Sequence, residues 1–157
     1  MPPCCQSIHN PDLIENIQDY LYAFLDDRTE DPDDIILWRD EILNLITDAN
    51  CIDDAGNSLL MMVIYHHVGP LTLALVTKLV EEYGAKVNYQ NFHYNPTLNA
   101  FQGGCTALHV AASHGYPEIV KYLLTQGADP TLKEDNETPY DMALAEGQRE
   151  CCNALRS

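Results

Sequence analysis

The first chemistry that this sequence suggests is that of a thiol beside an imidazole. Cys105 lies four residues before His109, and a cysteine paired with a histidine can act as a thiolate nucleophile. Neither a glycine-rich phosphate loop nor a pair of catalytic carboxylates accompanies these two residues. The sequence therefore offers one candidate nucleophile without a complete catalytic motif.

The histidines could also serve as metal ligands. His66 and His67, together with His93 or His114, could bind a transition metal through neutral imidazole nitrogens. No carboxylate or thiol is fixed beside them by sequence, as a complete ligand set would require. We therefore expect neither a metal nor another cofactor.

The cysteines could carry redox chemistry. The six include two vicinal pairs, Cys4/Cys5 and Cys151/Cys152, while Cys51 and Cys105 stand alone. This spacing is typical neither of a disulfide framework nor of a zinc site, so we predict reduced thiols. A nonenzymatic sensor that responds to oxidants or thiophilic metals remains an alternative function.

The composition limits the kinds of partner. The chain has 157 residues, 24 acidic against 8 basic, a net charge of −16 and 46% hydrophobic residues. These values suit one folded acidic domain that binds neither nucleic acid nor anionic lipid, because both of those need clustered Lys and Arg. No stretch approaches a membrane span and the first residues do not resemble a secretory signal. We expect a cytoplasmic monomer with a protein partner.

Local signals predict short helices in pairs. Asn10-Pro11-Asp12 and Asp31-Pro32-Asp33 each place a capping side chain before a proline at the first helical position. Apolar residues then recur at helical spacing. Gly84 and Gly127 lie where later helices must end in a left-handed conformation.

One segment carries a recognisable motif. Residues 104–115 read Gly-Cys-Thr-Ala-Leu-His-Val-Ala-Ala-Ser-His-Gly, and a helical segment at 117–124 ends before Gly127. The segment resembles an ankyrin repeat, whose signature is Thr-Pro-Leu-His-x-Ala with a period of about 33 residues. Thr138 begins a second copy 32 residues after Thr106, and Ser58 begins an earlier one in which Met61 replaces the motif histidine.

The resemblance implies an all-α, ankyrin-repeat solenoid of stacked helix-turn-helix units with short β-hairpin-like fingers. A tail at 1–10 would precede a single domain at 11–157, with units near 11–48, 50–88, 104–130 and 136–157. In this register His109 supports the backbone of a turn and Cys105 occupies a variable finger position. We therefore expect no enzyme.

An insertion at 92–103 enlarges the finger between the second and third units. It contains Phe92, Tyr94 and Phe101, and exposed aromatic residues are common anchors of protein interfaces. We predict that this insertion contacts the partner. The alternative is that its aromatic residues fold back and cover the widened gap between the units.

Family geometry places finger tips and first helices on a concave surface where partners bind. The resemblance implies that the following first-helix positions are exposed there: Met62, Tyr65, His66, Val110, Ser113, His114 and Met142. Finger tips would add Asp53, Asp54, Lys133, Glu134 and Asp135. Such a surface, acidic at its rim and partly apolar, suits a partner segment with a basic or mixed basic and apolar character.

The predicted function is that of a binding module that masks, sequesters or bridges another protein. The irregular units favour a microbial effector that acts on a host protein, which would place it in the host cytoplasm. The alternative is an endogenous inhibitor of a kinase or of a Rel-type transcription factor. The sequence does not identify the partner.

We predict that replacing Phe92, Tyr94 and Phe101 by Ala weakens capture of the partner from a cell lysate. The physical reason is the loss of aromatic contact area, while a surface loop contributes little to the helices. Affinity capture with mass spectrometry measures the first effect, and circular dichroism monitors the helices. Unchanged capture would remove the insertion from the binding site.

Overall fold

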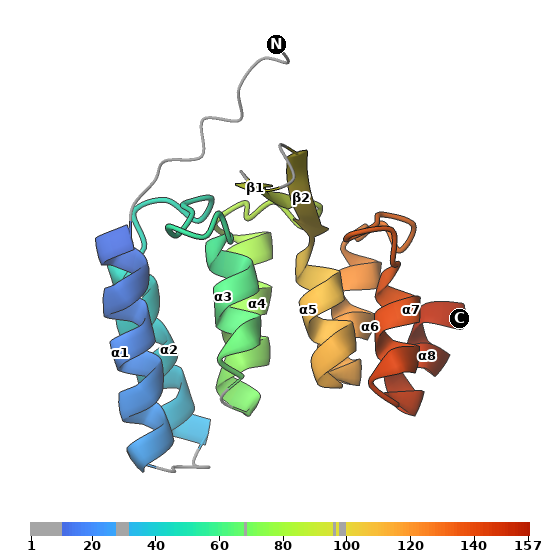
Figure 1. Cartoon of the computed structure of the whole chain (residues 1–157). Helices are drawn as coiled ribbons and strands as arrows, with labels where there is room; N and C mark the ends of the chain where they lie inside the picture. Colours follow the sequence, from blue (N-terminus) through green and yellow to red (C-terminus); the bar gives the residue numbers. More distant parts are fainter. Residues whose placement is uncertain (1–10, 28–31, 68, 96, 98–99) are drawn as a thin grey trace.

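The computed structural model describes residues 11–27, 32–67, 69–95, 97 and 100–157, in some cases the backbone alone. The described helices are α1 (Pro11–Asp27), α2 (Pro32–Leu45), α3 (Leu59–Tyr65), α4 (Pro70–Glu81), α5 (Ala107–His114), α6 (Pro117–Thr125), α7 (Pro139–Ala145) and α8 (Arg149–Arg156). They form successive pairs that stand side by side in a row (Figure 1). Helices α1, α3, α5 and α7 make one layer, and α2, α4, α6 and α8 make the other. The predicted helical solenoid is confirmed.

The first helix of three successive pairs begins at a hydroxyl cap, at Ser58, Thr106 and Thr138. In each case the hydroxyl accepts a hydrogen bond from the backbone N–H three residues later. The side chains of His109 and Asp141 each accept a hydrogen bond from the backbone N–H of their cap residue, which completes a capping box. Met61 has no group that can do so, and the second pair therefore has only half of this interaction.

The apolar core runs through the whole stack. Its largest fully buried side chains are Ile17, Leu21, Ile42, Leu59, Leu60, Ile64, Leu71, Leu75, Leu79, Leu108, Ile119 and Leu123. They belong to a single cluster that crosses every pair, from α1 to the buried Ala154 of α8. Each pair of helices therefore buries its apolar surface largely against the next pair.

Two asparagines tie the end of one pair to the end of the next. Asn50 donates to the carbonyl of Gly84 and accepts from the N–H of Lys86, at 3.3 and 2.9 Å. Asn88 makes the same two bonds one unit later, at 2.9 Å to the carbonyl of Gly127 and 2.8 Å from the N–H of Asp129. The sequence analysis did not identify this repeated bridge.

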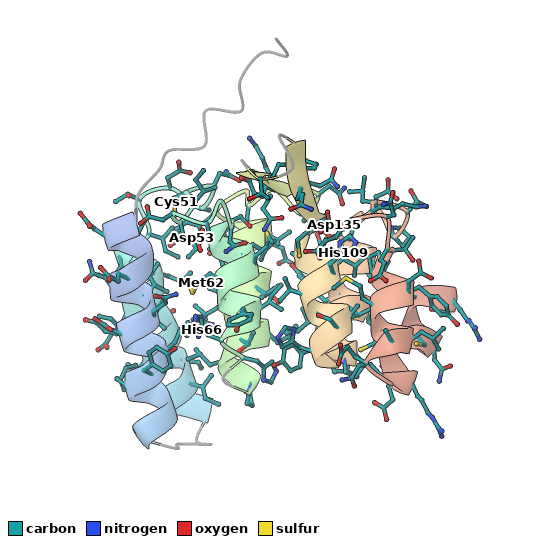
Figure 2. The ribbon with its side chains drawn as sticks, viewed as in Figure 1. Cys51, Asp53, Met62, His66, His109 and Asp135 are labelled. Carbon is teal, nitrogen blue, oxygen red and sulfur yellow. The ribbon has the colours of Figure 1, made fainter. Side chains whose placement is uncertain are left out.

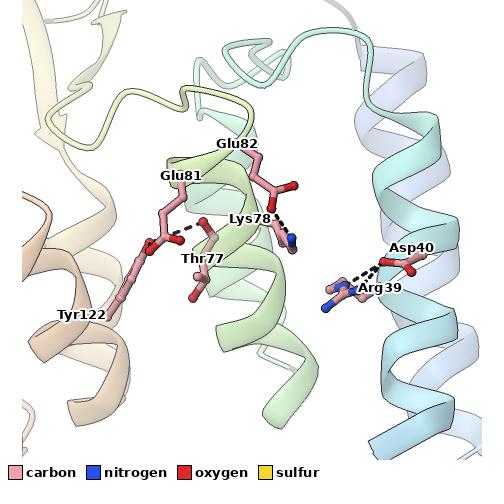
Figure 3. Close-up of polar contacts among 7 residues, drawn as sticks. All are labelled: Arg39, Asp40, Thr77, Lys78, Glu81, Glu82 and Tyr122. Carbon is pink, nitrogen blue, oxygen red and sulfur yellow. Dashed lines mark hydrogen bonds and ion pairs between the residues drawn. The ribbon is translucent and has the colours of Figure 1, made fainter.

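The second layer has a polar contact of its own between α4 and α6. The Tyr122 hydroxyl lies 3.2 Å from a carboxylate oxygen of Glu81 and 3.4 Å from the carbonyl oxygen of Thr77 (Figure 3). Burial and the neighbouring Glu81 raise the pKa of the Tyr122 phenol. The hydroxyl thus remains a neutral donor that joins two helices of successive pairs.

The inserted finger is an antiparallel hairpin of β1 (Asn91–Asn95) and β2 (Ala100–Cys105), with an irregularity between Asn91 and Phe92. Its backbone register pairs Phe92 with Gly103 and Tyr94 with Phe101. The hairpin stands beyond the ends of α3 and α5, on the side of the stack where the other fingers lie (Figure 1). The insertion therefore extends the finger rather than the helices.

We predict that Asn88→Ala lowers the free energy of unfolding by about 1 kcal/mol, because two hydrogen bonds between successive units are lost. Urea denaturation followed by circular dichroism measures the change. Asn153→Ala is the matched control, since Asn153 is an exposed residue of α8. Equal midpoints for the two variants would show that the bridge contributes nothing to stability.

Candidate functional site

A groove of about 400 Å³ lies on the concave side of the stack, between the fingers and the layer of first helices. Nine residues predicted from the sequence line it: Asp53, Met62, Tyr65, His66, Val110, Ser113, His114, Glu134 and Met142. Figure 2 shows Asp53 near the fingers, Met62 further along α3 and His66 near the opposite end. The tertiary structure thus brings residues from three units into one continuous surface.

The expected exposure of Met62 and Val110 is wrong. Met62 is 4% exposed and Val110 is 9% exposed. Both belong to first helices that pack against one another, α3 against α5 and α5 against α7. Their side chains therefore form the floor of the groove, while Tyr65 and His114 are exposed at its surface.

Four predicted residues with described side chains do not line the groove, namely Asp54, Phe92, Lys133 and Asp135. Asp54 is exposed in the turn beside it. Phe92 is 55% exposed, which agrees with an accessible insertion at that position. The side chains of Tyr94 and Phe101 lie outside the described part of the structure. Whether the aromatic insertion binds a partner therefore stays a prediction.

The fingers contribute a chain of polar contacts at one end of the groove. Asp53 accepts two hydrogen bonds from Asn57, from the backbone N–H at 2.7 Å and from the side-chain amide at 3.0 Å. Asn57 accepts a bond of 2.7 Å from Asn91, and Asn91 accepts one of 2.9 Å from the N–H of Cys105. This chain fixes the first finger, the hairpin and the start of α5 relative to one another.

Glu134 lies at the same end of the groove and is less well satisfied. One of its carboxylate oxygens, Oε2, is buried and has no hydrogen-bond partner among the described residues. Burial, followed by the charge of Glu134 and a hydrogen bond between the two side chains, raises the pKa of the Cys105 thiol. A buried carboxylate oxygen without a donor is energetically costly, so this position favours a ligand that brings a donor or a positive charge.

The other end of the groove carries a row of rings. His66 contacts Tyr22 and Tyr65 in edge-to-face geometry, with ring centroids 5.4 and 5.2 Å apart. Tyr65 contacts His114 in the same way at 5.3 Å. Gln18 of α1 lies 3.1 Å from Nε2 of His66. Burial lowers the pKa of His66, so this imidazole is neutral at pH 7.

His67 and Tyr116 continue the aromatic contacts outside the groove. Their rings are stacked with centroids 4.0 Å apart, and both line a separate hollow beside Pro70 and Pro117. Burial lowers the pKa of His67 as well. His67 therefore resembles His66 in its lowered pKa, although neither His67 nor Tyr116 lines the groove.

The residues that the sequence analysis missed are Gln18, Asn57, Met61, Asn91 and Cys105. Asn57 and Asn91 belong to no repeated sequence pattern, because the hydrogen bond between them joins two different fingers. Gln18 belongs to the most diverged unit. Met61 could have been found as the replacement of the motif histidine at a position next to the groove.

Cys105 and His109 do not form a nucleophile and its base. His109 is fully buried, and its ring accepts a bond from the N–H of Thr106 and bonds to the carbonyl of Glu137 at 3.3 Å. The Cys105 thiol donates to the carbonyl of Thr106. The described residues include no group of three or more His, Cys, Asp or Glu side chains that could hold a metal ion.

The described cysteines are buried. Cys51, Cys105, Cys151 and Cys152 are free thiols, and burial raises the pKa of Cys51 to about 11, with a contribution from Asp48. A thiol in this state is slow to ionise and to react. These four positions therefore do not support the alternative of a redox sensor.

Comparison with known proteins identifies the repeat. A family model for ankyrin repeats in three copies matches residues 38–134 and 73–157. The matched range begins within α2, so α1 lies outside it. Among the described residues, no helix is both long and apolar enough to cross a membrane.

Several relatives share part of the chain. The E3 ubiquitin-protein ligase Ufd4 of Drosophila melanogaster is 38% identical over 114 residues, 70% of this chain and 4% of that protein. Protein phosphatase 1 regulatory subunit 12A of Mus musculus is 42% identical over 64 residues, 40% of this chain and 6% of the relative. Protein phosphatase 1 regulatory subunit 27 of Homo sapiens is 35% identical over 66 residues, 41% of this chain and 36% of the relative. Each match therefore covers only a minor part of the relative's length.

We predict that Cys51 reacts with iodoacetamide about 100-fold more slowly in the native protein at pH 8 than in the unfolded chain. The reason is the rise in the pKa of its thiol from 9.0 to about 11, which reduces the thiolate population. Peptide mass spectrometry over a time course measures the rate, with the urea-unfolded chain as the reference. Equal rates in both states would contradict the burial of this thiol.

Proposed function

The chain belongs to the ankyrin-repeat family, and we propose that its concave groove holds an extended segment of a partner protein that carries Lys or Arg beside apolar residues. Members of this family are protein-interaction modules. The proposal concerns the kind of segment that this particular groove accommodates. It rests on the charge and the shape of the groove.

The buried Oε2 of Glu134, which has no hydrogen-bond partner among the described residues, is the observation that carries this proposal. None of the described residues that line the groove is Lys or Arg, whereas Asp53 and Glu134 are acidic. Met61, Met62 and Val110 provide a buried apolar floor beside these carboxylates. A cation next to an apolar side chain would satisfy the carboxylate and cover the floor in one segment.

Occupancy of the groove would mask, sequester or bridge the partner, and no catalysis by this chain is proposed. The names of two relatives, regulatory subunits of protein phosphatase 1, support a regulatory role of this kind. We place the protein in the cytoplasm, because its described cysteines are free buried thiols that suit a reducing compartment. An effector that acts on a host protein and an endogenous inhibitor would both use the groove in this way.

The proposal is tested with pooled labelled peptides in which one Arg is flanked by variable Leu, Ile, Phe, Met and Ser residues. The tightest binder is then titrated by fluorescence anisotropy. We predict that Glu134→Gln weakens its binding about tenfold, because a charge-assisted hydrogen bond is replaced by a neutral one. A matched peptide with citrulline in place of Arg should bind both proteins equally.

Glu146→Gln is the control variant, since Glu146 is exposed at the end of α7 and does not line the groove. It should bind the Arg peptide as the unmodified protein does. Circular dichroism verifies that both variants are folded. Failure of every pool to bind, or an equal loss in the two variants, would refute the proposed binding mode.

A further inference from the structure

The groove has two chemically different ends. The carboxylates of Asp53 and Glu134 belong to the fingers, whereas Tyr65, His66 and His114 lie at the C-terminal ends of α3 and α5. The separation follows from α3, which begins just after Ser58 in the finger and ends at Tyr65. At 1.5 Å per helical residue, the two ends are about 10 Å apart.

We propose that Tyr65, His66 and His114, with Tyr22 of α1 beside His66, form a second subsite at this end of the groove, which takes a second Lys or Arg side chain of the partner segment against its aromatic rings. This inference rests on the proposed function, because it assigns the other end of the same bound segment. An extended chain advances about 3.3 Å per residue, so the two basic residues should be about three positions apart.

The exposure and orientation of the rings support a cationic ligand. Tyr22 is 53% exposed and Tyr65 is 59% exposed, so much of each tyrosine remains accessible. Consecutive rings in the row are nearly perpendicular, at 76°, 84° and 73°, and they therefore present faces and edges in different directions along the row. The faces of aromatic rings attract cations, and Arg is a frequent partner.

The described contacts of the two imidazoles are with aromatic rings, the Gln18 amide, the Ser113 hydroxyl and a backbone carbonyl. His66 faces Gln18 and Tyr22 of α1 and Tyr65 of its own unit. His114 faces Tyr65 and Tyr116, and its Nδ1 lies 3.0 Å from the carbonyl of Val110.

The carboxylates that share the groove, Asp53 and Glu134, belong to the finger end. Protonation of His66 would therefore place a positive charge beside the bound cation. Two like charges about 5 Å apart in a watery groove weaken binding about fivefold.

The subsite predicts a gain in affinity from a second basic residue. Two peptides are made from the tightest one-Arg peptide. One carries a second Arg three positions from the first, and the matched control carries citrulline at that position. At pH 7.5 the second Arg should tighten binding about fivefold relative to citrulline, a typical effect of a cation on an aromatic face. Tyr65→Phe should keep this gain because it keeps the ring, and Tyr65→Leu should abolish it.

The pH dependence supplies a second readout. Between pH 7.5 and pH 5.5 the gain from the second Arg should fall, by at most about fivefold, because burial lowers the pKa of His66 and its imidazole acquires a positive charge only as the pH falls below the ordinary histidine range. His66→Gln should lose this dependence. His67→Gln is the control, since His67 does not line the groove, and it should behave as the unmodified protein.

The outcomes separate the two proposals. Binding of neither peptide at pH 7.5 refutes the proposed function and with it the subsite. Binding of the one-Arg peptide with no gain from the second Arg, or a gain that persists in Tyr65→Leu, refutes the subsite alone. An unchanged pH dependence in His66→Gln also overturns the subsite, provided that circular dichroism shows the protein folded at both pH values.

Discussion

The structure depends on one constraint, which is that no pair of helices in this chain can bury its own apolar surface. The pairs α1/α2, α3/α4 and α5/α6 bury Leu, Ile or Val side chains, whereas α7 and α8 bury smaller ones such as Ala143 and Cys151, and the buried side chains of successive pairs form one cluster. The stack therefore has one shared core that extends from α1 to α8. Because packing defines the spacing between pairs, it also fixes the position of every finger and every first helix on the concave side.

Polar contacts then fix the positions of the unit ends and fingers, which packing of the shared core does not determine. The Asn50 and Asn88 bridges hold successive units at their ends. The chain from Asp53 through Asn57 and Asn91 fixes the inserted hairpin against its neighbours. These contacts connect backbone segments that have no secondary structure in common. They explain how fingers of different length can line one continuous groove.

The sequence predicted most of the fold and about two thirds of the groove, for identifiable reasons. Thr106 and Thr138 repeat at the family period, and their caps begin α5 and α7 as expected. The register of the repeat then placed Tyr65 and His114 on the concave side. The register wrongly predicted exposed side chains at Met62 and Val110, because the same helical face both lines the groove and packs against the neighbouring first helix. Glu134 could be placed at a finger tip, but its unpaired oxygen could not be anticipated.

The sequence by itself determined the helical pairs, their caps, the acidic charge and the presence of an aromatic insertion, because these follow from local patterns within one repeat. Only the tertiary structure decided which groups meet. Tyr22 and His66 are 44 residues apart in the chain, and Asn57 and Asn91 are 34 apart. Contacts of this kind depend on the distance and angle between stacked units, and short-range patterns in the sequence determine neither. The two ends of the groove, one anionic and one aromatic, are therefore a property of the stack.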